Sequence, residues 1–92
     1  MRNPFRREQP EFTVEPTLIN GLTYREGDRE LWMPSYELLS TSPPSVVISR
    51  SDLRVWADGQ HLKGGPSLTT EDQARVKRNI ETYFDDTEVR WD

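Results

Sequence analysis

Cysteine is absent from this 92-residue chain, and its absence excludes several kinds of chemistry at once. A chain without cysteine forms no disulfides, binds no zinc through thiolates and offers no thiol nucleophile. Small secreted domains commonly depend on disulfides, so nothing here indicates secretion. The sequence also lacks an apolar run long enough to cross a membrane, and its first residues lack the apolar stretch of a signal peptide. We therefore expect a cytoplasmic protein with no membrane partner.

Hydrophobic residues are scarce as well, at 33% of the chain, whereas charged residues reach 30%. A chain of this length forms one domain with one modest core. Three Trp, three Tyr and three Phe supply much of the area that such a core can bury. Seven prolines, nearly all in the first half, leave the C-terminal third as the place for a long helix.

Histidine occurs once, as His61, in a glycine-rich stretch that predicts a loop. Catalysis needs a base or nucleophile within a positioned constellation, and no such group accompanies this histidine. Lys63 precedes the glycines, which is the reverse of the order in a phosphate-binding P-loop. Asp85 and Asp86 alone offer too few converging oxygens for a hard cation. We therefore predict no enzymatic activity, no catalytic residue, no cofactor and no metal.

The stretch from Leu22 to Met33 predicts a β-hairpin with a two-residue turn at Gly27-Asp28. Folding the chain at this turn sets Glu26 opposite Arg29 and Arg25 opposite Glu30. Side chains directly opposite each other share a face, so one face is a core face. Its members are Leu22, Tyr24, Leu31 and Met33. Trp32 lies on the second face, with Thr23, Arg25 and Glu30.

Trp32 on this second face has two explanations. Residues 11–19, through Phe12, or the second half of the chain could fold back over it and make it structural. Alternatively, Trp32 with Arg25 and Glu30 beside it is an anchor in a protein interface, where Trp and Arg are enriched. We favour the covered residue, and both explanations stay open.

The middle of the chain predicts short elements separated by proline. Residues 36–39 form a short buried segment after Pro34, and residues 45–49 are β-branched and read as a central strand. Residues 51–56 fit two structures. Leu53 and Val55 fit a strand, whereas Leu53 and Trp56 fit a helical turn capped by Ser51, and periodicity does not separate them.

The last third predicts a helix followed by a strand. Thr69 with Asp72 has the pattern of a capping box. An apolar stripe then follows at helical spacing, formed by Val76, Ile80, Tyr83 and Phe84. Asp85-Asp86 ends the helix, and Val89 and Trp91 alternate in a last strand. The predicted fold is α+β: a small, mainly antiparallel sheet of hairpin, strand and C-terminal strand, with one amphipathic C-terminal helix packed on one face.

Residues 1–19 are predicted to be an N-terminal arm and extended segment, and residues 20–92 a single α+β domain. Net charge is −4, with Arg2, Arg6 and Arg7 near the start and an acidic end. This balance disfavours nucleic acid and suits a basic protein partner. The candidate partner-binding residues are Asp85, Asp86, Glu88, Glu26, Asp28, Glu30 and Trp32. We favour the C-terminal acids, because the hairpin acids face arginines across the strands.

The order of four segments resembles that in the small α+β immunity proteins of bacterial polymorphic toxin systems, including contact-dependent growth inhibition. These segments are "LTYREGDRELWMPSYELL", "PPSVVISRSDLRVW", "LTTEDQARVKRNIETYF" and "EVRW". The resemblance covers roughly residues 20–92. It implies a cytoplasmic, non-enzymatic protein that binds and blocks one cognate toxin domain, such as a nuclease, in a stoichiometric complex. Toxin-contacting residues do not carry over by position. The alternative is a small nucleic-acid-associated accessory module that uses Arg2, Arg6 and Arg7 with Trp32.

Deleting residues 1–10 should leave folding and partner binding nearly unchanged, because this segment offers no core residues. Thermal unfolding of the truncated chain, together with its binding to the partner, measures both effects. Loss of either would make the segment part of the fold or of the recognition surface.

Overall fold

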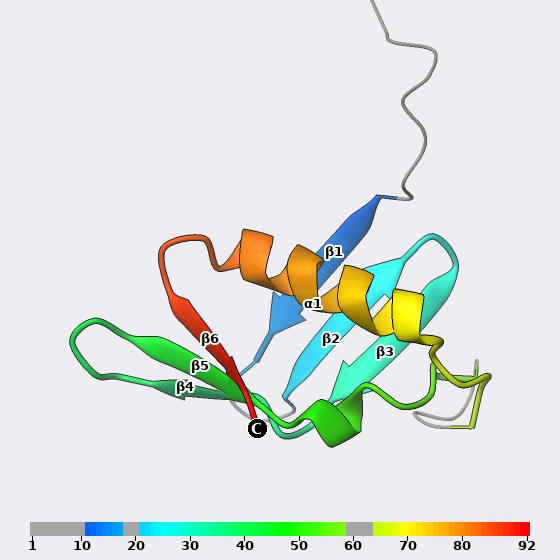
Figure 1. The fold of residues 1–92 in the computed structure, drawn as a ribbon, viewed down its shortest axis with the longest axis horizontal. Helices are drawn as coiled ribbons and strands as arrows, with labels where there is room; N and C mark the ends of the chain where they lie inside the picture. Colours follow the sequence, from blue (N-terminus) through cyan, green and yellow to red (C-terminus); the bar gives the residue numbers. More distant parts are fainter. Residues whose placement is uncertain (1–10, 18–20, 59–63) are drawn as a thin grey trace, which may run out of the picture.

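The computed structural model describes residues 11–17, 21–58 and 64–92. Within these residues the chain forms two three-stranded sheets, one 3₁₀ turn and one α-helix (Figure 1). The first sheet has the order β1-β2-β3 and the second β4-β5-β6. Their bounds are Phe12–Pro16 (β1), Leu22–Glu26 (β2), Arg29–Met33 (β3), Glu37–Leu39 (β4), Ser45–Ile48 (β5) and Glu88–Trp91 (β6), with η1 at Arg50–Asp52 and α1 at Thr70–Tyr83.

The α+β class is confirmed, but the strands divide between two sheets where the sequence predicted one. All pairs in the first sheet are antiparallel, and β1 belongs to it through its pairing with β2. In the second sheet β4 and β5 are antiparallel, whereas β5 and β6 are parallel. A parallel pair cannot be closed by a tight turn, and here the connection between its strands contains α1.

The predicted hairpin is confirmed residue by residue. Leu22 lies opposite Met33 and Tyr24 opposite Leu31, and all four side chains are buried. The turn places Gly27 at a φ of 61°, a conformation that glycine adopts without steric cost. The alternation of the two strands thus decides which face of the first sheet becomes the core.

The middle of the chain follows the prediction only in part. β5 is the central strand of its sheet, as expected. Residues 36–39 are not a buried segment, because β4 is an edge strand and Leu38 is 45% exposed. Residues 51–56 form neither a continuous strand nor a capped helical turn at Ser51. Instead η1 ends at Asp52, and Val55 makes an isolated bridge with Ser67.

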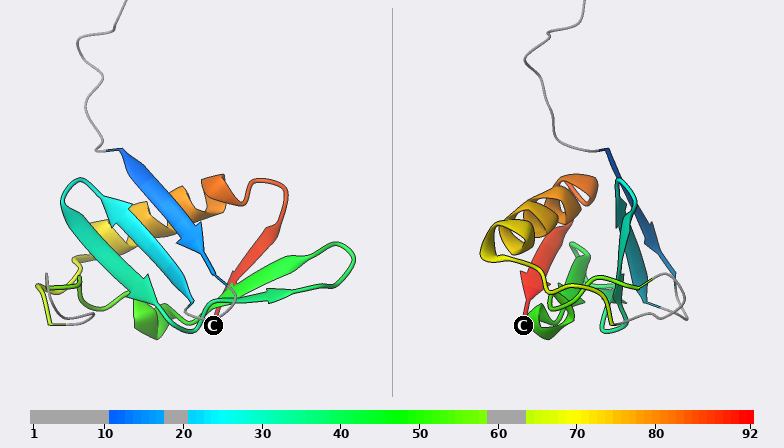
Figure 2. Two further views of the ribbon diagram at one scale, coloured as in Figure 1. Left: turned by 180° about the vertical axis from the view of Figure 1, so that it is seen from behind. Right: turned by 90° about the vertical axis from the view of Figure 1, so that its right-hand side faces the viewer.

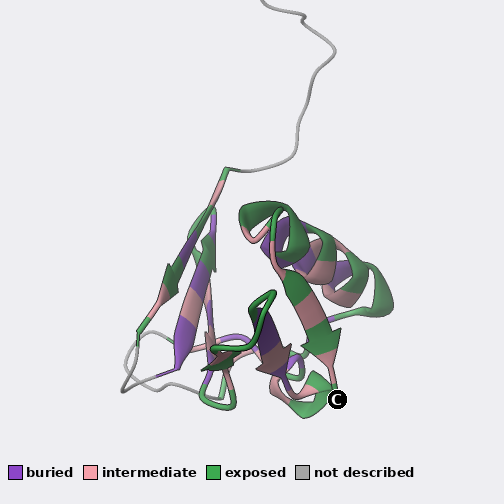
Figure 3. Cartoon of the chain, turned by 90° about the vertical axis from the view of Figure 1, so that its left-hand side faces the viewer, coloured by how far each residue is buried: buried purple, intermediate pink, exposed green. Residues whose placement is uncertain are grey.

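Helix α1 begins with the predicted capping box between Thr69 and Asp72. Val76 and Ile80 are fully buried, as the stripe requires. Tyr83, however, is 49% exposed, so its place on the buried stripe was wrong. The helix ends at this residue, and the ring of Tyr83 lies edge-on against the ring of Phe84. Figure 3 shows buried and exposed segments alternating along the helix.

The helix crosses one face of the first sheet, and the second sheet lies beside this pair (Figures 1 and 2). The core lies on the helix side of the first sheet. It combines the inner face of β2 and β3 with Val46 and Ile48 of β5 and with Val76 and Ile80 of α1. The two sheets and the helix therefore share one core, and its packing depends on the position of α1.

Replacing Ile80 with Ala should destabilise the protein by about 2–5 kcal/mol, because the side chain is fully buried and leaves a cavity. Urea unfolding measures this loss, and Thr82→Ala on the exposed face is the matched control. An Ile80→Ala variant as stable as the parent protein would show that this face of α1 does not carry the core.

Candidate functional site

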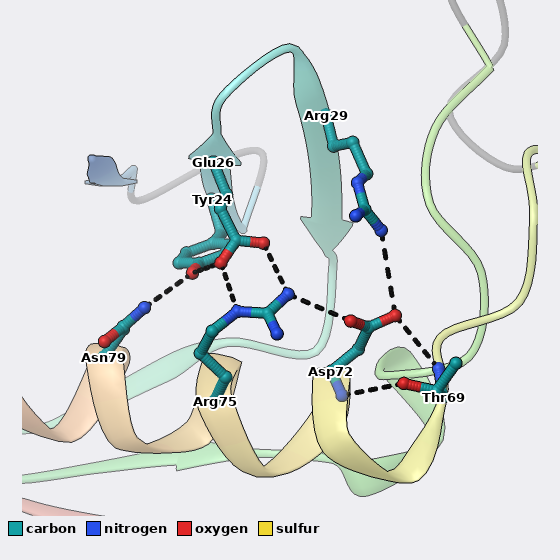
Figure 4. A network of polar contacts seen from close by, with 7 residues as sticks. All are labelled: Tyr24, Glu26, Arg29, Thr69, Asp72, Arg75 and Asn79. Atoms are coloured by element: carbon teal, nitrogen blue, oxygen red, sulfur yellow. Dashed lines mark hydrogen bonds and ion pairs between the residues drawn. The ribbon is translucent and has the colours of Figure 1, made fainter. Parts of the chain in front are cut away.

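Glu26 at the end of β2 is the centre of the most extensive polar network in the described residues (Figure 4). Its side chain is 2% exposed and faces the helix. Arg75 of α1 binds both of its oxygens, with Nε 2.5 Å from Oε2 and one terminal nitrogen 2.8 Å from Oε1. This planar, bidentate geometry is the strongest form of carboxylate recognition by a side chain.

The network continues along the first turns of α1. The same Arg75 nitrogen donates to Oδ1 of Asp72 at 2.9 Å. The other oxygen of Asp72 accepts the backbone N–H of Thr69 and lies 3.7 Å from Arg29. Arg29 also stands over the ring of Trp56, 4.9 Å from its centroid. The helix cap, the hairpin and the core are therefore joined through two arginines, Arg75 and Arg29, and two carboxylates.

Tyr24 closes the other side of the network. Its hydroxyl donates to Oε2 of Glu26 at 3.2 Å and accepts from Nδ2 of Asn79 at 2.9 Å. Both residues are buried. A buried amide or phenol without a partner is costly, and these two satisfy each other.

The surroundings shift the pKa of three members. The hydrogen bond from Arg75 to Glu26 is the main reason that the pKa of Arg75 is raised. Burial raises the pKa of Tyr24 to about 12, with Glu26 adding to the effect. Burial alone would raise the pKa of Asp72, but the Thr69 N–H and the Arg75 guanidinium together lower it. The lowered pKa keeps Asp72 charged in a place where it already has its partners.

These contacts make the network structural. Sequence reasoning set Glu26 against Arg29, and the two do lie opposite each other in the hairpin register. Glu26 nevertheless makes its ion pair with Arg75, 49 residues away, and is not available as an exposed partner-binding acid. One signal was present: Glu26 follows Leu22 and Tyr24 at the spacing of the core face.

The other two hairpin acids lie at the surface. Asp28 is exposed in the turn, and Glu30 is half-buried and pairs with Arg25 at 3.1 Å. Arg25 also binds Glu15 of β1 at 2.7 Å. The predicted pairing across the hairpin is thus present for Glu30. Of the three hairpin candidates, Asp28 alone is exposed and makes no ion pair within the described residues.

The C-terminal candidates Asp85, Asp86 and Glu88 are all exposed, and none makes an ion pair within residues 11–17, 21–58 and 64–92. Asp86 accepts a long hydrogen bond of 3.4 Å from the hydroxyl of Thr87. The three residues occupy the turn between α1 and the start of β6 (Figure 1). Their negative charge is open to solvent.

Trp32 is half-buried on the outer face of the first sheet. A recess of about 330 Å³ lies beside it, lined also by Ser51, Asp52, Arg54 and Val55. The second half of the chain therefore reaches this side, and Ala57 donates a backbone hydrogen bond of 2.7 Å to Glu30. Phe12 lies on the opposite face, with its ring 5.9 Å from that of Tyr24.

Several predictions fall on residues that the structure does not describe. His61, Lys63 and the arginines Arg2, Arg6 and Arg7 lie outside the described residues. In the described part of the chain, no group of three or more His, Cys, Asp and Glu side chains is placed to hold a metal ion. In that part too, none of the helices is both long enough and apolar enough to cross a membrane.

No protein-family model matches the chain, and neither a curated protein nor a solved structure is significantly similar to it.

Raising the pH from about 10 to about 12 should destabilise the fold through Tyr24. Below its ordinary pKa of 10.0 the phenol is neutral in both states. Between that value and about 12, only the unfolded chain loses the proton, which favours unfolding. Urea unfolding across this range should show a smaller decline for Tyr24→Phe than for Tyr83→Phe. Equal declines would show that the fold does not hold the Tyr24 phenol neutral.

Proposed function

We propose that this chain is an immunity protein that binds and neutralises a basic toxin domain, such as a nuclease, in the cytoplasm of the bacterium that makes both. The complex is stoichiometric, and it blocks the active site of the toxin or a site near it. The observation that carries the proposal is the position of Asp85 and Asp86. Both are exposed carboxylates that follow directly on the end of α1.

This position is unfavourable for the free protein. A helix C-terminus carries partial negative charge, which cations stabilise and anions destabilise. The last turn of α1 contains no basic residue, and the two aspartates follow its C-cap, Phe84. A cationic surface placed against this end would stabilise both the negative end of the helix dipole and the two carboxylates. The arrangement therefore supports a basic partner more than it supports the fold.

The acidic residues of the hairpin and of the helix start differ from Asp85 and Asp86 in their ion pairs. Glu26 and Asp72 are bound by Arg75, and Glu30 by Arg25, so these charges are compensated within the chain. The C-terminal acids are not compensated in this way within the described residues. A concentrated charge of one sign accelerates association with a partner of the opposite sign.

Reversing both charges, as Asp85→Lys with Asp86→Lys, should slow association with the toxin domain by roughly tenfold or more at low salt. The effect should shrink at high salt, because ions screen exposed charges. Stopped-flow mixing with the C-terminal domain encoded by the gene immediately upstream measures the rate. The matched control is Glu11→Lys with Asp28→Lys, which changes the net charge equally at the exposed hairpin end.

The control should associate nearly as fast as the parent protein. Slower association of the control than of the C-terminal variant would assign recognition to the hairpin. Co-expression tests the function itself: the chain should rescue growth from the upstream toxin domain and co-purify with it. Failure of both rescue and co-purification would contradict the proposal.

A further inference from the structure

Two large apolar side chains are strongly exposed in the described part of the chain, Tyr83 at 49% and Leu38 at 45%. Two ring contacts and a shared recess connect them. The ring of Tyr83 lies edge-on against Phe84, 4.8 Å between centroids, and Phe84 stacks with Tyr36 at 6.2 Å. Tyr36 and Leu38 in turn line one recess of about 230 Å³, together with the polar residues Thr17, Glu37 and Ser40. We call Tyr36, Leu38, Tyr83 and Phe84 the aromatic patch.

The aromatic patch is built from distant parts of the sequence and is only partly covered by the fold. Tyr36 and Phe84 are half-buried against the core, so they support the two exposed members from below. Burial and, to a smaller degree, the nearby Tyr83 raise the pKa of Tyr36. Grouped apolar exposure of this kind marks interaction sites more often than scattered apolar residues do. Aromatic residues are also enriched at protein interfaces.

The charges around the aromatic patch indicate what binds there. Asp85 and Asp86 follow Phe84 directly, and Glu37 stands between Tyr36 and Leu38 and lines the same recess. A cationic partner complements these carboxylates. A second copy of this chain would not, since a symmetric contact places the same acids against each other.

We propose that the aromatic patch docks a basic segment of a partner protein that presents one aliphatic or aromatic side chain between Lys and Arg residues. The apolar side chain enters the recess beside Tyr36 and Leu38, while the flanking cations pair with Asp85 and Asp86. This inference rests on the proposed function, because it takes the toxin domain as the source of the segment.

The test uses two capped synthetic peptides and the full chain labelled with ¹⁵N. One peptide is Lys-Arg-Trp-Arg-Lys, and its matched control, Lys-Arg-Gly-Arg-Lys, has the same charge without the apolar side chain. In NMR titrations the Trp peptide should bind about fivefold or more tightly than the Gly peptide, because only Trp buries apolar area. The amides that shift should include residues 36–38 and 83–86.

Variants of the exposed members separate the apolar contribution from the charge. Tyr83→Ala and Leu38→Ser should each bring the Trp peptide close to the affinity of the Gly peptide. Tyr83→Phe keeps the ring and should keep the advantage. The proposal is wrong if the two peptides bind the parent protein equally, if Tyr83→Ala leaves the advantage intact, or if the shifts map to another surface.

Two results that reveal a different occupant of the aromatic patch would also overturn the proposal. A dimer seen in sedimentation and abolished by Tyr83→Ala would assign the aromatic patch to a second copy. Severalfold tighter peptide binding after deletion of residues 1–10, where Phe5 stands among arginines, would assign it to the chain's own N-terminal segment. If the Trp peptide docks but growth is not rescued, only the proposal of a toxin partner is contradicted. If growth is rescued but the two peptides bind equally, only the proposal for the aromatic patch is contradicted.

Discussion

The bidentate ion pair between Arg75 and Glu26 sets the position of the helix on the first sheet. A carboxylate removed from water must have its charge and lone pairs satisfied, and Glu26 is almost entirely buried. Arg75 meets this need only when α1 lies across the end of β2 in one orientation (Figure 4). Apolar packing alone tolerates sliding, whereas a planar fork on two oxygens does not.

Several other features follow from this placement. Once Arg75 is in position it also reaches Asp72, whose second oxygen caps the helix start through the N–H of Thr69. One turn further on, Asn79 reaches the hydroxyl of Tyr24, and Val76 and Ile80 face the core. At the end of the helix the ring of Phe84 stacks on that of Tyr36, the residue before β4, and the exposed Asp85 and Asp86 follow directly. Asp72, a structural acid, therefore lies at the start of α1, whereas Asp85 and Asp86, which we assign to recognition, follow its end.

The sequence predicted what depends on neighbouring residues and missed what depends on distant ones. The hairpin register and the capping box follow from the turn at Gly27 and from the spacing of Thr69 and Asp72, and both are confirmed. The division into two sheets depends on how β6 returns after the helix, and no local pattern records that. The pairing of Glu26 with Arg75 is equally non-local, and the opposing Arg29 supplied a plausible wrong partner.

The candidate site shows the same limit. Asp85 and Asp86 are neighbours in the acidic C-terminal segment, so the sequence alone was enough to predict them as partner-binding candidates. The exposure of Tyr83 was missed, because helical spacing does not tell where the covering layer ends. Leu38 joins the same surface through Tyr36 and Phe84, a neighbourhood that exists only after folding.

The central claim is that the acidic residues form two sets with opposite effects on stability. Glu26 and Asp72 stabilise the fold, whereas Asp85 and Asp86 destabilise the free protein. Urea unfolding of the free protein tests it directly by comparing Glu26→Gln with the double variant Asp85→Asn and Asp86→Asn. Glu26→Gln should lower the free energy of unfolding by about 1.5–3 kcal/mol, because it weakens a buried charge-assisted hydrogen-bond pair. The double variant should raise it by about 0.3–1 kcal/mol, because it removes negative charge from a helix C-terminus. A loss of stability in both proteins would contradict the claim, since it would make the C-terminal acids part of the fold.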